Sequence, residues 1–146
     1  MKYNKNNYKE LVDEFTPKNN MIRNCIMAFI FGGAICTLGE IFKNLYMSGL
    51  SIPEEEASSI SLVTLIGLSA LLTGLGWYDN LGKIGGAGTV VPITGFANSV
   101  VSPALEYKKE GFVLGTASNI FKLAGPVLVY GYFASFIAGL LSLVLK

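Results

Sequence analysis

Residues 57–78 of the chain read ASSISLVTLIGLSALLTGLGWY, a run of 22 residues without a charged side chain. A helix of about 20 apolar residues is long enough to cross the hydrocarbon core of a bilayer. The run ends in Trp77 and Tyr78, and aromatic residues at this place are typical anchors at the membrane interface. The run therefore predicts a transmembrane helix, around which the rest of the chain can be placed.

Other long uncharged runs lie on both sides of this one. Residues 24–39 carry no charge, and with their apolar flanks from Met21 onward they predict a first span of about 22 residues. Residues 123–145 predict a last full span of 23 uncharged residues. Residues 111–121 are apolar but short, so we expect a half-span helix there, which Lys122 separates from the last span.

A further uncharged run, residues 84–105, has the composition of a broken segment rather than of a regular helix. Residues that break or weaken helices recur along it: Gly85, Gly86, Gly88, Pro92, Gly95, Asn98, Ser99, Ser102 and Pro103. Non-helical backbone survives at membrane depth only where protein or a water-filled cavity satisfies its polar groups. We therefore expect this run either to re-enter the membrane from one side or to cross it as a broken helix.

These runs together predict an all-α integral membrane protein. We expect about three full transmembrane helices, a glycine- and proline-broken or re-entrant segment and a short half-span helix. Residues 1–20 form a polar N-terminal segment, in which the apolar spacing from Tyr8 to Phe15 is typical of a short helix lying on the lipid headgroups. Residues 21–146 form a single transmembrane domain.

The composition excludes several classes of function. Of the 146 residues, 51% are hydrophobic and 14% are charged, against about 25% charged residues in a typical soluble domain. The net charge of +1 provides no basic stripe for nucleic acid. The chain has no histidine, which removes the commonest general base and zinc ligand. We therefore expect neither enzymatic activity nor a metal or cofactor site.

The placement of basic residues orients the spans. Five Lys or Arg residues precede the first span, and Lys43 alone lies in the polar connection expected over residues 43–56. The positive-inside rule then places the N-terminus in the cytoplasm and this connection on the opposite side. Re-entry of residues 84–105 would return Lys108 and Lys109 to the cytoplasmic face, which obeys the rule better than a crossing would.

Polar and helix-breaking residues inside the broken run are the first candidates for a functional site. They are Pro92, Thr94, Gly95, Asn98 and Ser99. Packing alone does not explain this combination, because buried amides and hydroxyls in hydrocarbon need hydrogen-bond partners. We expect these residues to line a polar path for a solute, with close packing of small residues as the alternative.

Charged residues near the ends of the runs are further candidates. Lys122 is flanked by uncharged runs and lies close to Asn119, so this pair could face an anionic solute. Asp79 and Glu106 could form a charged gate, although a carboxylate near the end of a span is also typical of an interfacial residue.

Three strings of residues resemble the stage V sporulation protein AC family of endospore-forming bacteria. They are LLTGLGWYD at residues 71–79, GGAGTVVPITGFANS at residues 85–99 and FKLAG at residues 121–125. Within the second string, the part from Pro92 to Ser99 is the most specific. The related AEb proteins share parts of the same pattern.

The resemblance implies a component of the SpoVA complex in the inner membrane of the spore. This family is associated with moving dipicolinic acid, together with calcium, into the developing spore and out of it at germination. The resemblance also implies membrane lipid, a soluble SpoVAD-like protein and a membrane SpoVAEb-like protein as partners. The expected function is a channel or channel subunit, and the alternative is a non-conducting structural subunit that packs against a pore-forming AEb-type partner.

Overall fold

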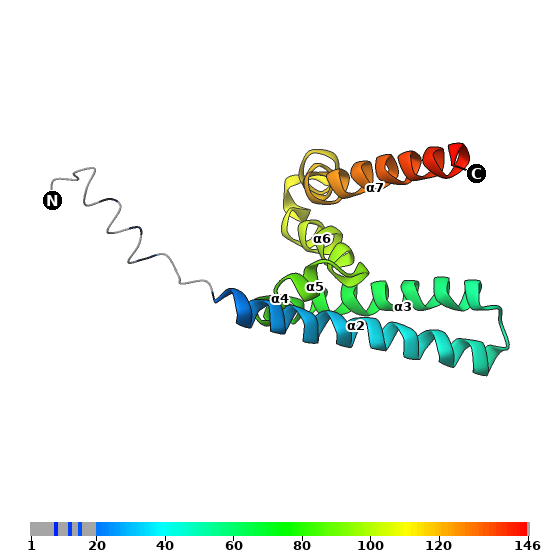
Figure 1. Cartoon of the computed structure of the whole chain (residues 1–146). Coiled ribbons are helices and arrows are strands. Elements are labelled where there is room, and N and C mark those ends of the chain that lie inside the picture. The colour runs from blue at the N-terminus through cyan, green and yellow to red at the C-terminus, as the bar shows by residue number, and fades with distance from the viewer. Residues whose placement is uncertain (1–7, 9–11, 13–14, 16–19, 146) are drawn as a thin grey trace.

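The computed structural model describes Tyr8, Val12, Phe15 and residues 20–145, and every regular element in this part of the chain is helical (Figure 1). The elements are α2 (Met21–Leu50), α3 (Glu54–Gly74), α4 (Tyr78–Gly85), α5 (Ala87–Val90), α6 (Ile93–Glu106), the 3-10 turn η1 (Lys108–Glu110), the π-helical turn η2 (Phe112–Ala117) and α7 (Ser118–Val144). Three stretches, Met21–Leu50, Glu54–Gly74 and Phe112–Val144, are long and apolar enough to cross a membrane, which confirms the expected fold class. The interfacial helix expected over residues 8–15 falls largely outside the described residues.

Helices α2 and α3 form an antiparallel hairpin, and α2 is longer than the sequence predicts. The connection expected over residues 43–56 is wrong at both ends, because α2 continues through Lys43 to Leu50 and α3 already begins at Glu54, so only residues 51–53 link the helices. The Lys43 ammonium lies 2.8 Å from a Glu40 carboxylate oxygen and 3.2 Å from one of Glu54. With its charge paired in this way, Lys43 fits within the helix and ties it to the start of α3.

Helix α3 ends at Gly74, four residues earlier than the uncharged run. Gly76 has a φ of 72°, a conformation that glycine adopts without strain, and the chain reverses direction there. Tyr78 consequently opens α4 with only 5% of its surface exposed. Its interpretation as an interface anchor is therefore wrong, while Trp77 remains exposed.

The chain after this turn runs back along α2. Helices α4 and α5 pack on α2, where Gly88 lies against the backbone of Ala28, and an added Cβ on Gly32 would be 3.5 Å from Gly88. The helix breaks at Gly86, which has a φ of 50°, and again before Pro92. The expected broken segment is thus present as two short helices joined to α6.

Helix α6 then returns beside α3, and the two helices run in the same direction. Ser69 contacts Thr94, and one turn later Thr73 contacts Asn98. The turn at Pro92 lines one cavity with Cys36 and Leu65, which lie near the middles of α2 and α3. Relative to the hairpin, the segment therefore enters from the end at which α3 stops and comes back to that same end (Figure 1).

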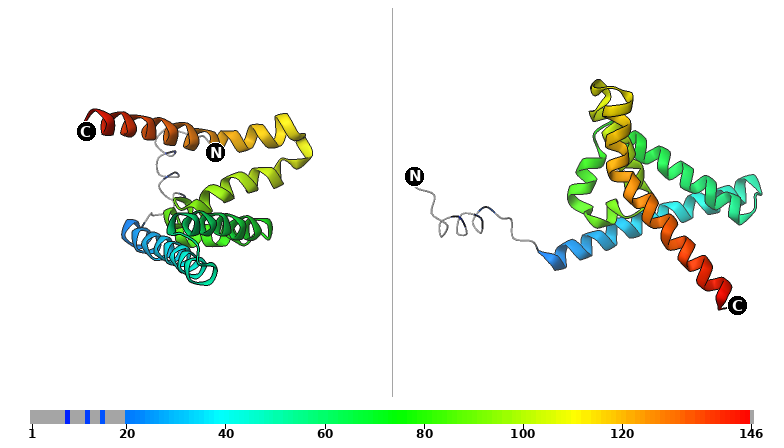
Figure 2. Two further views of the ribbon diagram at one scale, coloured as in Figure 1. Left: turned by 90° about the vertical axis from the view of Figure 1, so that its right-hand side faces the viewer. Right: turned by 90° about the horizontal axis from the view of Figure 1, so that it is seen from above.

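The C-terminal helix differs from its expected boundaries. A half-span helix separated by Lys122 is not what the structure has, because η2 runs directly into α7 and Lys122 lies in the second turn of α7. A single lysine does not interrupt a helix, since its intrinsic helix propensity is high. Helix α7 packs on α6 and η2 and stands apart from the α2–α3 hairpin (Figure 2).

Candidate functional site

A cluster of buried hydroxyl groups joins α3 to residues 78–106, called the re-entrant segment because it starts and finishes at the same end of the α2–α3 hairpin. The Ser69 hydroxyl donates to the Thr94 carbonyl oxygen at 2.6 Å. The Tyr78 hydroxyl donates to the Thr89 carbonyl oxygen at 2.7 Å and lies 3.0 Å from the Thr94 hydroxyl. Ser69, Thr89 and Thr94 are 1%, 2% and 7% exposed, so the cluster is shielded from the surroundings of the protein.

The break before Pro92 explains why these hydroxyls are needed. Proline has no backbone N–H, and a helix that ends leaves its last carbonyl groups without partners inside the helix. The Thr89 carbonyl, one residue from the end of α5, is such a group, and the Tyr78 hydroxyl satisfies it. An unsatisfied buried carbonyl would cost about 1–3 kcal/mol, so the tyrosine stabilises the broken backbone at this depth.

A second polar contact lies one turn further along α3. The Thr73 hydroxyl is 2.9 Å from the Asn98 amide oxygen and 2.7 Å from the Ser69 carbonyl oxygen. Ser99, in contrast, donates to the Phe96 carbonyl of its own helix at 2.7 Å. Thr94, Asn98 and Ser99 of α6 are thus hydrogen-bonded to protein groups in this structure.

Glycines allow the re-entrant segment to pack by direct backbone contact. A Cβ on Gly95 would collide with the carbonyl oxygens of Thr89 and Val90, and one on Gly88 would collide with the Ala28 carbonyl. A Cβ on Gly85 would come within 2.8 Å of the Phe31 ring. No larger residue fits at these three positions without displacing the segment.

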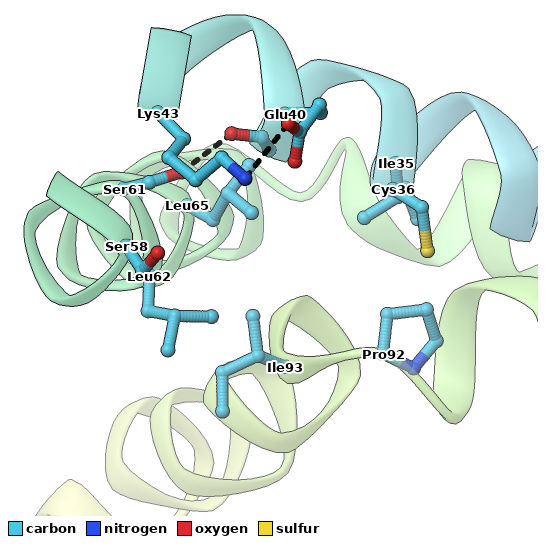
Figure 3. A pocket seen from close by; sticks show the side chains of 11 residues that line it. Ile35, Cys36, Glu40, Lys43, Ser58, Ser61, Leu62, Leu65, Pro92 and Ile93 are labelled. Carbon is cyan, nitrogen blue, oxygen red and sulfur yellow. Dashed lines mark hydrogen bonds and ion pairs between the residues drawn. The ribbon is translucent and has the colours of Figure 1, made fainter. Parts of the chain in front are cut away.

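A cavity of about 410 Å³ lies between α2, α3 and the turn into α6 (Figure 3). The ion pair of Glu40 and Lys43 lies at one end of it, and Cys36 and Pro92 lie at the other. The Ser61 side chain also lines the cavity, and its hydroxyl donates to the Gly39 carbonyl at 2.7 Å.

Two more cavities border the same segment. One, of about 370 Å³, lies between the start of α2 and the α4–α5 turn and is lined by Asn24, Cys25, Lys83 and Gly86 among others. The other, of about 250 Å³, is apolar and lies behind the hydroxyl cluster, with Tyr78 in its wall. The re-entrant segment therefore has free space on both sides of its contact with α2.

The structure brings together four of the residues expected to line a path. Pro92, Thr94, Gly95 and Asn98 all face α3 or the segment itself, whereas Ser99 bonds only within its own helix in the contacts described above. Thr94 and Gly95 are buried, so both are packed rather than open to a path in this structure.

The charged candidates lie elsewhere. Lys122 is exposed and donates to the Asn119 side-chain oxygen at 2.8 Å, and Asn119 donates in turn to the Gly115 carbonyl at 2.8 Å. Both residues belong to α7 rather than to the re-entrant segment. Asp79 in the first turn of α4 and Glu106 at the end of α6 are exposed.

Sequence reasoning missed Ser69, Thr73, Tyr78 and Thr89. A signal for the first two was present, because the buried residues of α3 are spaced by four: Ala57, Ser61, Leu65 and Ser69. Small and hydroxyl-bearing residues at this spacing mark the face of a membrane helix that packs on protein. Thr73 continues the same spacing.

Comparisons connect this architecture with known proteins. The family model described as SpoVAC/SpoVAEB sporulation membrane protein matches residues 24–141. The chain is 50% identical over 137 residues to "Stage V sporulation protein AC" of Bacillus subtilis (strain 168), with 94% of this chain and 91% of that protein covered. No solved structure matches the chain. The matched residues include the whole re-entrant segment.

Proposed function

Because the chain belongs to the SpoVAC/SpoVAEB family of sporulation membrane proteins, we propose that it is a channel or channel subunit of the SpoVA complex. Its solute is dipicolinic acid with calcium, moved across the inner membrane of the spore during sporulation and germination. The N-terminus lies on the cytoplasmic, spore-core side, and the protein has no catalytic role. A soluble SpoVAD-like protein and a membrane SpoVAEb-like protein are its partners.

The observation that carries this proposal is the broken segment beside the middle of the α2–α3 hairpin. A continuous helix satisfies its own backbone hydrogen bonds, whereas short helices and a turn within a membrane leave some of them to other groups. A protein that serves only as an anchor has no need of such a segment. Broken helices of this kind recur where transporters bind their solutes. The cavities on either side of the segment fit a passage that the segment interrupts.

The re-entrant segment is the gate in this proposal. Pro92, Thr94, Gly95, Asn98 and Ser99 become part of the solute path when the segment moves away from α3. In the closed form, the hydroxyls of Ser69 and Tyr78 donate hydrogen bonds to backbone carbonyl groups of the segment. In a hydrated path these carbonyl groups would be exposed to water.

Charged residues at the ends of the helices guide the solute. Lys122 and Asn119 attract the anionic carboxylates from the cytoplasmic side. In this proposal α7 begins on that side, and Lys122 lies in its second turn. Asp79 and Glu106 form the charged rim of the same mouth, where α4 begins and α6 ends.

Flux through the purified protein tests the proposal. Liposomes loaded with dipicolinate are prepared with and without the protein, and release is followed by terbium fluorescence outside them. We expect release that depends on the protein and that exceeds the release of a larger neutral sugar. Release no faster than from protein-free liposomes, with the protein correctly inserted, would refute a channel formed by this chain alone.

A structural subunit is the second candidate, and the exposed surface of α7 favours it. Gly131 and Gly139 lie on this helix with no atom within 4 Å of an added Cβ, and Ser135 between them completes a stripe of small residues. Such stripes allow membrane helices to pack closely. Release that requires co-reconstitution of the SpoVAEb-like protein would favour this function over the first.

A further inference from the structure

Helix α2 has one face composed mostly of small residues, and this face borders the re-entrant segment. Its members are Cys25, Ala28, Gly32, Cys36 and Gly39. Spacings of three and four residues place all of them on one side of a helix. Most of them contact the re-entrant segment or α3, or line a cavity beside these elements.

The cavities divide this face into two halves. The cavity of about 370 Å³ is lined by Cys25 and the cavity of about 410 Å³ by Cys36. Both thiols are free. Eleven residues separate the cysteines, which is roughly 16 Å along a helix. Between the two cavities, the backbone of Gly88 lies directly on the backbone of Ala28.

Charged groups border both cavities. Lys83 lines the cavity that contains Cys25, and the pair of Glu40 and Lys43 lines the other. Charged side chains within membrane proteins face partners or water-filled cavities rather than lipid. The cavity with Cys36 also contains the hydroxyl groups of Ser58 and Ser61.

We propose that these cavities are the two vestibules of one solute path along α2, and that the contact of Gly88 with Ala28 is the seal between them. The cavity with Cys25 is the inner vestibule, and the cavity with Cys36 is the outer vestibule. This inference rests on the proposed function, and it places the wall of the path on α2, where none of the residues expected from the sequence lies.

The seal can open without breaking a strong interaction. Gly88 has no side chain, and its contact with Ala28 is with backbone atoms of that residue. A small outward movement of α5 would join the two vestibules. The hydroxyl cluster around Tyr78 lies on the other side of α5 and limits this movement through Thr89.

The two native cysteines provide the test, because a thiol in water forms the reactive thiolate while a thiol in an apolar environment does not. Cys25→Ser and Cys36→Ser each leave one reporter, and the double variant is the control. A charged, membrane-impermeant methanethiosulfonate is added to membrane vesicles of either orientation. We expect Cys25 to react only from the side of the N-terminus and Cys36 only from the opposite side.

Modification of the remaining cysteine should then block dipicolinate flux in liposomes relative to the flux of the same single variant before the reagent is added, while the reagent should not change the flux of the double variant from its own starting value. Thiols that do not react, that react equally from both sides, or that react without any loss of flux would overturn the two vestibules. Absence of flux through the unmodified wild-type protein would instead refute a channel formed by this chain alone, so the two failures are distinguishable.

Gly88→Ala tests the seal itself, with Gly33→Ala as the matched control because no atom lies within 4 Å of a Cβ there. The new methyl group should push α5 away from α2, so that Cys36 reacts from both sides and dipicolinate leaks. Gly33→Ala should change neither result. Unchanged sidedness of Cys36 in an inserted Gly88→Ala protein would show that the seal lies elsewhere, and the cysteine reporters still test the vestibules if this variant does not fold.

Discussion

The buried hydroxyl of Tyr78 lies within hydrogen-bond distance of two other residues, Thr89 and Thr94. Its hydroxyl satisfies a carbonyl group that the helix break leaves free, and it also lies within hydrogen-bond distance of Thr94. No buried side-chain nitrogen or oxygen in the described residues lacks a partner, so the cluster has no spare groups. Removing one hydroxyl therefore affects groups in α5 and α6 at once.

We expect Tyr78→Phe to loosen the re-entrant segment. The substitution leaves the Thr89 carbonyl without its donor, at a cost of about 1–3 kcal/mol, and this cost falls on the closed form. Dipicolinate release should become faster, and the unfolding midpoint in detergent should fall. Tyr130→Phe is the control, because Tyr130 is exposed on α7. Equal behaviour of the two variants would mean that the hydroxyl does not hold the segment closed.

Gly95 is the position with the least room. We expect Gly95→Leu to abolish dipicolinate flux while the protein is still inserted in normal amount, because the side chain would meet the Thr89 and Val90 carbonyls. Gly67→Leu in α3 has open space around it and should keep its flux. Flux and insertion are measured on the same preparation, and normal flux in Gly95→Leu would show that the α5–α6 contact is not needed for transport.

Among the elements, α6 determines the topology of the whole chain. It is 14 residues long, about 21 Å, which is shorter than the roughly 30 Å hydrocarbon core. It starts beside the middle of α3 and runs in the same direction as α3. A membrane that contains the α2–α3 hairpin therefore has the end of α6 on the side where α3 ends.

Labelling of introduced cysteines tests this topology in a background without native cysteines. We expect Lys5→Cys and Lys108→Cys to react from the same side of the membrane, and Glu55→Cys, at the start of α3, to react from the other side. Reaction of Lys5→Cys and Lys108→Cys from opposite sides would mean that residues 84–105 cross the membrane and would contradict the re-entrant path.

The elements also show which parts of the fold the sequence could predict. Long uncharged runs identified the three spans, because length and hydropathy alone decide whether a helix fits the bilayer. Glycine and proline identified the broken segment, because each of them weakens or breaks a helix at its own position. Tyr78 was misassigned because an aromatic residue at the end of an apolar run looks the same whether it anchors at the interface or turns inward. Tyr78 turns inward because the chain reverses direction at Gly76. Its hydroxyl then finds its hydrogen-bond acceptor on Thr89, eleven residues later in the sequence.

The candidate site was predicted less completely than the fold. Pro92, Thr94, Gly95 and Asn98 were singled out because helix-breaking and polar residues are unusual in an uncharged run, and their place in a solute path stays a prediction. Their partners Ser69 and Thr73 look like ordinary residues of a membrane helix and become visible only when α6 is placed beside α3. The cavities along α2 could not be predicted at all, since a cavity is defined by elements that are distant in the sequence.

At the scale of the molecule, the charges are distributed unevenly. Lys122 is the one cation of the transmembrane domain that has long uncharged runs on both sides, whereas Lys108 lies in an exposed turn. A unit charge influences an anion much more strongly at low effective dielectric than in bulk water. The two lysines should therefore differ in their effect on an anionic solute.

We expect Lys122→Gln to reduce dipicolinate flux strongly relative to the flux of a small neutral solute, and Lys108→Gln to have little effect. Both solutes are measured in the same liposomes, at low and at high salt. If both substitutions lower the flux of both solutes equally, Lys122 anchors or folds α7 and the anion-guiding role is lost.

The shortness of α4 and α5 also has a consequence for how the protein is made. Helices of 8 and 4 residues are too short for the insertion machinery of the cell to recognise as spans. They can enter the bilayer only after α2 is in place to receive them, with Ala28 and Gly32 as the docking surface for Gly88 of α5. We therefore expect biogenesis in two stages, in which a chain that ends after α3 is already inserted, while the re-entrant segment docks later and can fail to dock without any loss of membrane targeting.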